Sequence, residues 1–356
     1  MPATQKNKPL KRVLVTRFSA IGDVAMTIPV LYDVCRANPA TEFVMLTRPA
    51  MAAMMVCPPP NLTVHPADVS SDYKGIGGMM RLLREVEAAH GPVDAMADLH
   101  NVLRTLIIGA RLKLRGIPVK RIDKSRSSRR ALTRRRGKVM RPLTPQPRRY
   151  AEVFEALGLA TSGRPFTSVF GSAKGSPEAF AAVTPPKRPG ERWIGIAPFA
   201  RHQGKIYPPE RMRMVVDMLA ERPDTRLFLF GGGEKERAIL GSWTRPNVIS
   251  LAEKRLGFAV ELSLLSHLDV MVSMDSANMH LASLAGVPVV SVWGATHPFC
   301  GFMGYGQSAD NAVQLSLPCR PCSIFGNKPC HRGDYHCMAG IAPETIAGRV
   351  TQLIDS

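Results

Sequence analysis

The sequence predicts an α/β protein built from two Rossmann-like domains, each organised around a parallel sheet. Two observations predict this fold: short β-branched runs alternate with amphipathic helices, and the alternation restarts halfway along the chain. The length of 356 residues agrees with two domains, at roughly 150 residues for each. We therefore expect an N-terminal domain at 1–183, a linker rich in Pro, Lys and Arg at 184–190, a C-terminal domain at 191–340 and a C-terminal helix at 341–356.

The first half begins with a predicted strand at 12–16, a polar turn and a helix at 24–37 whose apolar residues recur at helical spacing. Asn38-Pro39 ends this helix, and a second strand follows at 42–46. This order predicts parallel strands joined by a right-handed crossover. The other elements expected in this half are a strand at 93–99 and helices at 102–112 and 150–157.

The second half repeats the alternation of strand and helix, which is why it predicts a second Rossmann-like domain. The expected strands lie at 193–197, 226–230, 248–250, 270–273 and 287–293, and the expected helices at 209–221 and 234–241.

The charge of the chain is strongly positive, with 47 Lys and Arg against 28 Asp and Glu, a net charge of +19. Such a field attracts polyanions, including nucleic acid, phosphorylated lipid and membrane surfaces. Eleven of the basic residues lie within 124–149, which contains no acidic residue. This segment, the basic arm, is either a solvated mobile loop or an anion-binding arm.

Several features bear on the compartment. The first twelve residues are polar and basic and lack the apolar region of a signal peptide. No uninterrupted apolar run reaches the roughly 20 residues that a transmembrane helix needs. Seven cysteines without a signal peptide favour a reducing cytoplasm.

One candidate catalytic residue, Asp23, follows the first predicted strand. It comes after Gly22, expected to permit a tight turn, at the point where the first helix begins. One interpretation is a helix N-cap, a position that Asp favours. The other is a carboxylate at the carboxyl end of a strand, where open α/β sheets bind ligands and where it would act as a general base.

Two segments of the second half carry groups suited to a nucleotide. Lys205 follows the first strand of this half and is either a solvated lysine or a point charge for a diphosphate. Gly231, Gly232 and Gly233 follow the next strand and would let the backbone approach phosphate or ribose. Glu234 then begins a helix. Either the helix dipole favours its negative charge at this position, or its carboxylate accepts hydrogen bonds from ribose hydroxyls.

A further segment begins at Asp275, where a strand ends and a helix of small residues starts at Ser276 and Ala277. The free N–H groups of such a helix start form an anion site. His280 lies one turn inside the helix, where it faces the same ligand or packs in the core.

In this order and spacing, these segments resemble the family-nine glycosyltransferases, the lipopolysaccharide heptosyltransferases. Arg17 to Pro29, R-x-S-x-I-G-D-V-x-x-T-x-P, resembles the opening signature of that family. Asp275 to Trp293, D-S-A-x-x-H-L-A-x-x-x-G-V-P-V-V-x-x-W, resembles the closing one. The likeness covers essentially the whole chain, although Arg201 and His202 stand where the family often has small hydroxyl residues.

The resemblance implies a GT-B fold, with two Rossmann-like domains facing across a cleft, and inverting transfer of heptose from ADP-heptose without a metal. On that basis Asp23 deprotonates the acceptor, and the N-terminal domain binds it. The acceptor contacts that we expect are Arg17, Ser19 and Gly22 and, from the charge of the basic arm, Arg134, Arg135 and Arg136. The expected nucleotide-sugar contacts are Lys205, Gly232, Gly233, Glu234, Asp275, Ser276, Ala277 and His280. The acceptor would be an anionic lipid A and Kdo-type glycolipid, so we expect a peripheral enzyme on the cytoplasmic face of the inner membrane, its basic arm against anionic lipid.

A cysteine cluster near the C-terminus has the spacing C-x2-C-x7-C-x6-C and consists of Cys319, Cys322, Cys330 and Cys337. Its close Cys-x-x-Cys half resembles a zinc knuckle, whereas its second half fits no standard finger. Both a structural zinc site and reduced thiols without metal stay open.

Two rival functions remain at this point. A related transferase would use another nucleotide sugar or acceptor, because pocket shape is not visible in the sequence. A non-catalytic binder of anionic lipid or nucleic acid would explain the charge but not the ordered motifs. The aromatic content of 6% also offers few platforms for stacking bases.

Overall fold

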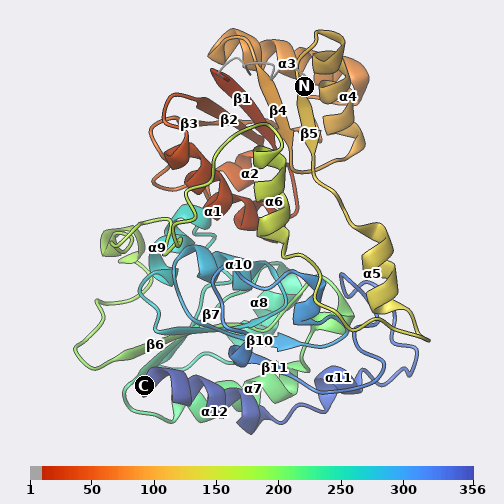
Figure 1. The fold of residues 1–356 in the computed structure, drawn as a ribbon. Helices are drawn as coiled ribbons and strands as arrows, with labels where there is room; N and C mark the ends of the chain where they lie inside the picture. The colour runs from red at the N-terminus through yellow and green to blue at the C-terminus, as the bar shows by residue number, and fades with distance from the viewer. Residues whose placement is uncertain (1–9) are drawn as a thin grey trace. The chain divides into compact units, whose positions relative to one another are not determined.

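The computed structural model describes residues 10–356, which form two compact units (Figure 1). The first unit consists of the described residues up to Asp123 together with Pro147–Pro165, and the second of Lys124–Gln146 and Phe166–Ser356. Each unit contains one parallel sheet, so the predicted pair of Rossmann-like units is confirmed. Most of the N-terminal segment interpreted as lacking a signal peptide, residues 1–9, lies outside the described residues.

The sheet of the first unit has five parallel strands with β1 in the middle. Their order is β3 (Leu62–Pro66), β2 (Glu42–Thr47), β1 (Arg12–Thr16), β4 (Ala95–Asp98) and β5 (Val119–Arg121). The helices of this unit are α1 (Ile21–Ala37), α2 (Pro49–Ala52), α3 (Gly75–His90), α4 (Leu103–Leu114) and α6 (Gln146–Glu155). In the register, Val13 of β1 lies opposite Phe43 of β2 and Ala95 of β4.

Burial on both faces explains why β1 is a continuous apolar run. Val13, Leu14 and Val15 are fully buried, as expected for a central parallel strand covered on both sides by helices. Helix α3, which we did not predict, packs onto this core through Met79, Leu82, Leu83 and Val86 at helical spacing. Three glycines in its first turn lower the helix propensity of this segment, so the sequence pattern does not predict the helix.

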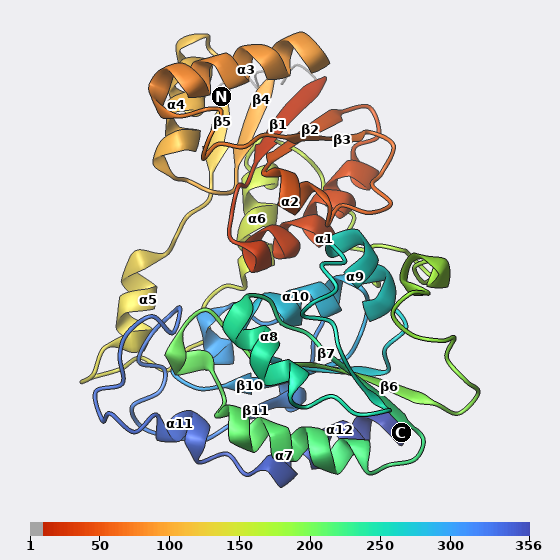
Figure 2. The same ribbon diagram turned by 180° about the vertical axis from the view of Figure 1, so that it is seen from behind.

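The sheet of the second unit has six parallel strands, with the order β11 (Ala312–Gln314), β10 (Val289–Trp293), β9 (Val270–Met274), β6 (Arg192–Ala197), β7 (Thr225–Leu229) and β8 (Val248–Ser250). The α-helices of this unit are α5 (Arg126–Thr133), α7 (Pro209–Ala220), α8 (Glu234–Gly241), α9 (Phe258–Leu265), α10 (Ala277–Leu284), α11 (His336–Ala339) and α12 (Pro343–Ile354). Figure 2 shows α7 and α12 side by side on the same face of the sheet. Their apolar sides join the core beneath β6 and β9.

The unit boundaries differ from those expected from composition. Most of the basic arm, 124–146, belongs to the second unit, because the Leu143 N–H donates to Phe299 O at 2.9 Å and the Gln146 N–H to Gly301 O at 2.8 Å. The expected linker at 184–190 also lies inside the second unit, where Lys187 pairs with Asp269 at 2.6 Å. Tertiary contacts, which composition does not reveal, decide where the chain passes from one unit to the other.

Among the described residues, no helix combines the length and the apolar character that crossing a membrane requires.

Arg320 links the loop after β10 to the segment that follows β11. Its buried guanidinium donates to the backbone oxygens of Trp293 at 3.1 Å and Thr296 at 2.9 Å, and also to those of Gly294 and Leu315. One side chain therefore satisfies four carbonyl groups.

We expect Arg320→Ala to lower the free energy of unfolding by about 3 kcal/mol, because it leaves several buried carbonyls without donors. Chemical denaturation measures this change. The control Arg213→Ala removes a half-exposed arginine from α7 and should change stability by less than about 0.5 kcal/mol. Equal effects of the two substitutions would contradict the role given to Arg320.

Candidate functional site

Each sheet has one place where the strand order reverses, and open α/β sheets bind ligands at the carboxyl ends of the strands there. In the first unit this place lies between β1 and β4, and in the second between β6 and β9. The sequence motifs around Asp23 and Asp275 follow β1 and β9, so the topology brings both motifs to reversal points.

Asp23 is the third residue of α1, which begins at Ile21 rather than at Val24. It is therefore not the N-cap, and the simple N-cap interpretation is corrected. Its carboxylate instead accepts a hydrogen bond from the Ala20 N–H at 3.3 Å and pairs with Arg17 at 2.6 Å. The side chain of Asp23 is 27% exposed, so the carboxylate is held on one side and accessible on the other.

Arg17 is the residue that holds Asp23. Its buried guanidinium also donates to Leu99 O at 2.6 Å and lies 5.8 Å from the ring centre of Tyr150. Burial by itself would lower the pKa of Arg17, but Tyr150 and Asp23 outweigh it and raise the pKa above its usual value. Arg17 therefore stays charged and positions Asp23, and its expected contact with an acceptor stays a prediction.

The other two acceptor residues expected near β1 differ in their surroundings. Ser19 is partly exposed in the loop before α1. Gly22 lies in the first turn of α1 and has no positive φ, which corrects the expected tight turn.

The sequence analysis missed Asp98, which lies inside the strand predicted at 93–99, and His100, which follows that strand. The fully buried Asp98 accepts hydrogen bonds from the N–H groups of His100 at 3.0 Å and Asn101 at 2.8 Å. His100 Nδ1 in turn accepts from the Phe18 N–H at 3.4 Å. The loops after β1 and β4 are thus joined, and the polar run directly after the strand was the signal available in the sequence.

In the second unit, Lys205 and Asp275 form an ion pair at 2.8 Å across the reversal point between β6 and β9. Both side chains are largely buried, with 15% and 4% exposed. The stem of Lys205 packs against Gly326, where any Cβ would clash with it. A charged lysine held in this way presents a fixed cation at the carboxyl edge of the sheet.

Helix α10 begins beside this pair. Ser276 is its N-cap, but the side chain makes no capping hydrogen bond to the helix and lies 3.3 Å from the Ser273 hydroxyl. The first N–H groups, beginning at Ala277, therefore keep the partial positive charge of a helix start. His280 is buried one turn further along.

The glycine run after β7 borders the same edge, because β7 is the next neighbour of β6. Gly233 has a φ of 90°, a conformation that favours glycine. The N–H of Gly232 donates to Glu236 Oε2 at 2.7 Å. Glu234, expected at the ribose, is exposed at the first position of α8, and Glu236 is a partner that the sequence analysis missed.

The residues expected to bind the nucleotide sugar thus lie at the ends of three adjacent strands, β9, β6 and β7, of the second unit. Asp23, Arg17 and Ser19 belong to the first unit. His202, in the loop before Lys205, has its pKa lowered by partial burial and by the charges of Arg201 and Lys205. It is therefore protonated to a smaller extent at pH 7 than a free histidine. Chemically, the two units offer a carboxylate base and a site that can stabilise a departing anion.

The basic arm is folded and anchored, which corrects its interpretation as a mobile loop. It contains α5, and Lys138 donates to Cys319 O at 2.8 Å and Pro321 O at 2.9 Å. Arg134, Arg135 and Arg136 follow α5 and are exposed.

The cysteine cluster is drawn together by the fold. All seven cysteines of the chain are free thiols, and the four of the cluster line one small cavity together with His331 and His336. Burial raises the pKa of Cys337 to about 11, and the other three thiols of the cluster act on it electrostatically. Within residues 10–356, however, no group of three or more His, Cys, Asp or Glu side chains is placed to hold a metal ion. The zinc site stays a prediction.

Comparison with known proteins points to one family. The family model described as glycosyltransferase family 9 (heptosyltransferase) matches residues 99–335. Lipopolysaccharide heptosyltransferase 1 of Pseudomonas aeruginosa is 26% identical over 322 residues, which cover 87% of this chain and 86% of that protein.

Two solved structures show the same fold. A family 9 glycosyltransferase from Veillonella parvula has a TM-score of 0.73 at 19% identity, with 97% of this chain and 98% of that chain covered. The E. coli heptosyltransferase WaaC with ADP-2-deoxy-2-fluoro heptose has a TM-score of 0.62 at 18% identity, covering 97% and 99%. The fold class implied by the resemblance, GT-B with two Rossmann-like units, is confirmed.

If the four clustered thiols bind zinc, protein purified without chelator will contain about one zinc per chain. Elemental analysis will detect it, and Cys319→Ser or Cys337→Ser will remove it because each removes one sulfur ligand. The control Cys57→Ser changes an exposed thiol outside the cluster and should keep the metal. Folded wild-type protein without metal would contradict the prediction.

Proposed function

The chain belongs to glycosyltransferase family 9, and we propose that it transfers a heptose from ADP-heptose to an inner-core acceptor of lipopolysaccharide with inversion of configuration. The observation that carries this proposal is the Lys205–Asp275 ion pair beside the start of α10, at the reversal point of the second sheet. The family makes the chain an enzyme, so the non-catalytic binder is no longer favoured.

The donor is proposed to bind to the second unit. Its diphosphate would meet the ammonium group of Lys205 and the first N–H groups of α10, which both favour anions. Glu234 or Glu236 would accept hydrogen bonds from the ribose, since both follow the glycine run after β7. The likeness to WaaC, whose solved structure contains an ADP-heptose analogue, supports ADP-heptose as the donor.

The proposed reaction is a single displacement. Asp23 takes the proton of the acceptor hydroxyl, the acceptor oxygen forms a bond to the anomeric carbon, and the bond from that carbon to the diphosphate oxygen breaks. ADP leaves with the electron pair, and Lys205 stabilises its negative charge. Attack opposite to the leaving group inverts the anomeric centre. Arg17 keeps the Asp23 carboxylate in place throughout.

The acceptor is proposed to be a lipid A-linked, Kdo-type anionic glycolipid at the cytoplasmic face of the inner membrane. Ser19 lies in the loop that leads to Asp23 and would contact the acceptor near the reacting hydroxyl. The exposed arginines Arg134, Arg135 and Arg136 would meet negative groups farther along the glycolipid or on the membrane.

Calorimetry with ADP, UDP and GDP tests the donor. We expect ADP to bind preferentially, and Lys205→Ala to weaken ADP binding by at least about tenfold, because one charge-assisted contact is worth about 1.5–3 kcal/mol. The control Lys235→Ala changes an exposed lysine of α8 and should leave ADP binding nearly unchanged. A preference for UDP or GDP would instead indicate another nucleotide sugar.

Asp23→Asn tests the base. We expect kcat to fall by a factor on the order of 100 to 10,000, since the amide does not accept a proton. ADP affinity should stay unchanged, because Asp23 belongs to the other unit. A transfer assay with ADP-heptose and Kdo-lipid A measures kcat, and Asp72→Asn, an exposed carboxylate of the same unit, is the control. Full activity of Asp23→Asn would exclude the proposed base.

A further inference from the structure

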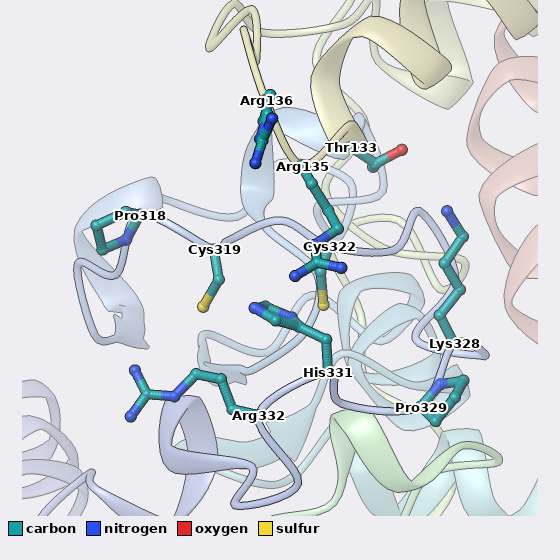
Figure 3. Close-up of a pocket in the computed structure, with 10 residues that line it drawn as sticks. All are labelled: Thr133, Arg135, Arg136, Pro318, Cys319, Cys322, Lys328, Pro329, His331 and Arg332. Atoms are coloured by element: carbon teal, nitrogen blue, oxygen red, sulfur yellow. The ribbon is translucent and has the colours of Figure 1, made fainter.

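A cavity of about 900 Å³ lies in the second unit, between the basic arm and the cysteine segment, defined here as residues 318–337. Figure 3 shows Arg135 and Arg136 pointing toward it from the arm, and His331 from the opposite wall. The complete lining is Thr133, Arg135, Arg136, Pro318, Cys319, Cys322, Lys328, Pro329, His331 and Arg332. No acidic residue belongs to this wall.

The charges around the cavity are mostly uncompensated. Arg332 pairs with Asp334 at 2.9 Å. For Arg135, Arg136 and Lys328, by contrast, there is no ion pair within the part of the chain that the structure describes. Three exposed cations around one concave space repel each other, so an anion with several negative groups would lower the free energy of this arrangement.

Two other cations of the arm, Lys138 and Arg129, contact the protein itself. Lys138 is bound to backbone oxygens of Cys319 and Pro321, and Arg129 lies over the rings of Phe302 at 5.4 Å and Phe325 at 5.5 Å. These contacts attach the arm to the cysteine segment. The two walls of the cavity are therefore joined before any ligand arrives.

Exposed apolar side chains accompany the charges. Of the seven large apolar residues that are exposed in the described chain, three belong to the arm or the cysteine segment: Val139 (40% exposed), Met140 (45%) and Phe325 (46%). A soluble phosphate would gain nothing from them. Cationic and apolar side chains on the same two segments are typical of proteins that bind at the surface of an anionic membrane.

We propose that this cavity binds the phosphate- or carboxylate-bearing headgroup of an anionic membrane lipid, with Arg135, Arg136 and Lys328 as the recognising cations. The inference rests on the proposed function in placing the enzyme at a lipid surface. It deepens that proposal in two ways: it adds Lys328, which lies outside the basic arm, and it separates the recognising cations from Arg129 and Lys138, which hold the arm.

The test compares two triple variants of the full chain that remove equal charge. Arg135→Gln/Arg136→Gln/Lys328→Gln empties the cavity of its unpaired cations, whereas Arg126→Gln/Arg130→Gln/Arg141→Gln removes three exposed cations from elsewhere on the arm. Co-sedimentation measures binding to vesicles of phosphatidylglycerol and phosphatidylcholine in equal parts, with pure phosphatidylcholine as the neutral reference. We expect the cavity variant to lose on the order of 100-fold in affinity, about fivefold for each cation, and the control to lose less than about tenfold.

Equal losses in the two variants would overturn the proposal, because they would indicate attraction by diffuse charge alone. Unchanged binding of the cavity variant would also overturn it. Inorganic tripolyphosphate, titrated in parallel, separates a soluble ligand from a lipid: if it binds to the cavity and the vesicles do not, the lipid assignment is wrong. ADP binding by the wild-type chain and by the two variants reports on the donor site independently. A wild-type chain that binds anionic vesicles but not ADP would contradict the proposed function and not this inference.

Discussion

The Lys205–Asp275 ion pair is the interaction on which the arrangement of the second unit depends. It joins the loops after two neighbouring strands, β6 and β9, at the point where the strand order reverses. Burying two charges is costly unless they are paired, so each residue fixes the other. The consequence is a cation and a helix start presented together at one edge of the sheet, and the glycine run after β7 completes that edge.

In the first unit, other residues join the two loops at the reversal point. Arg17 connects the loop after β1 to Leu99 beyond β4 and also pairs with Asp23. Asp98 accepts hydrogen bonds from two N–H groups of the loop after β4. In both units a cation bridges the reversal point and a carboxylate is its partner. In the second unit the pair fixes an ammonium group beside the start of α10, and in the first it leaves a partly exposed carboxylate that can accept a proton.

The positive charge of the chain serves more than one purpose. Arg320 and Lys138 are used inside the second unit, where they satisfy backbone carbonyls of the loop after β10 and of the cysteine segment. Arg135, Arg136 and Lys328 surround a cavity without carboxylates. The net charge of +19 therefore combines cations that satisfy backbone carbonyls with cations that line a cavity, and only the positions of individual side chains separate the two groups.

The sequence by itself determined the two α/β units, the bounds of most strands to within a few residues, and the segments around Asp23, Lys205 and Asp275. These features depend on local periodicity and on motifs with fixed spacing, which a linear chain displays directly. Only the tertiary structure decided that the arm packs on the second unit, that Arg17 holds Asp23, that Asp98 organises the neighbouring loop, and that Lys328 joins Arg135 and Arg136 around one cavity. The position of the arm and the grouping of Lys328 with Arg135 and Arg136 depend on residues that are far apart in the sequence. The partners of Arg17 and Asp98 depend on how the loops after β1 and β4 fold. Composition records how many charges a segment has, but not which groups face them after folding.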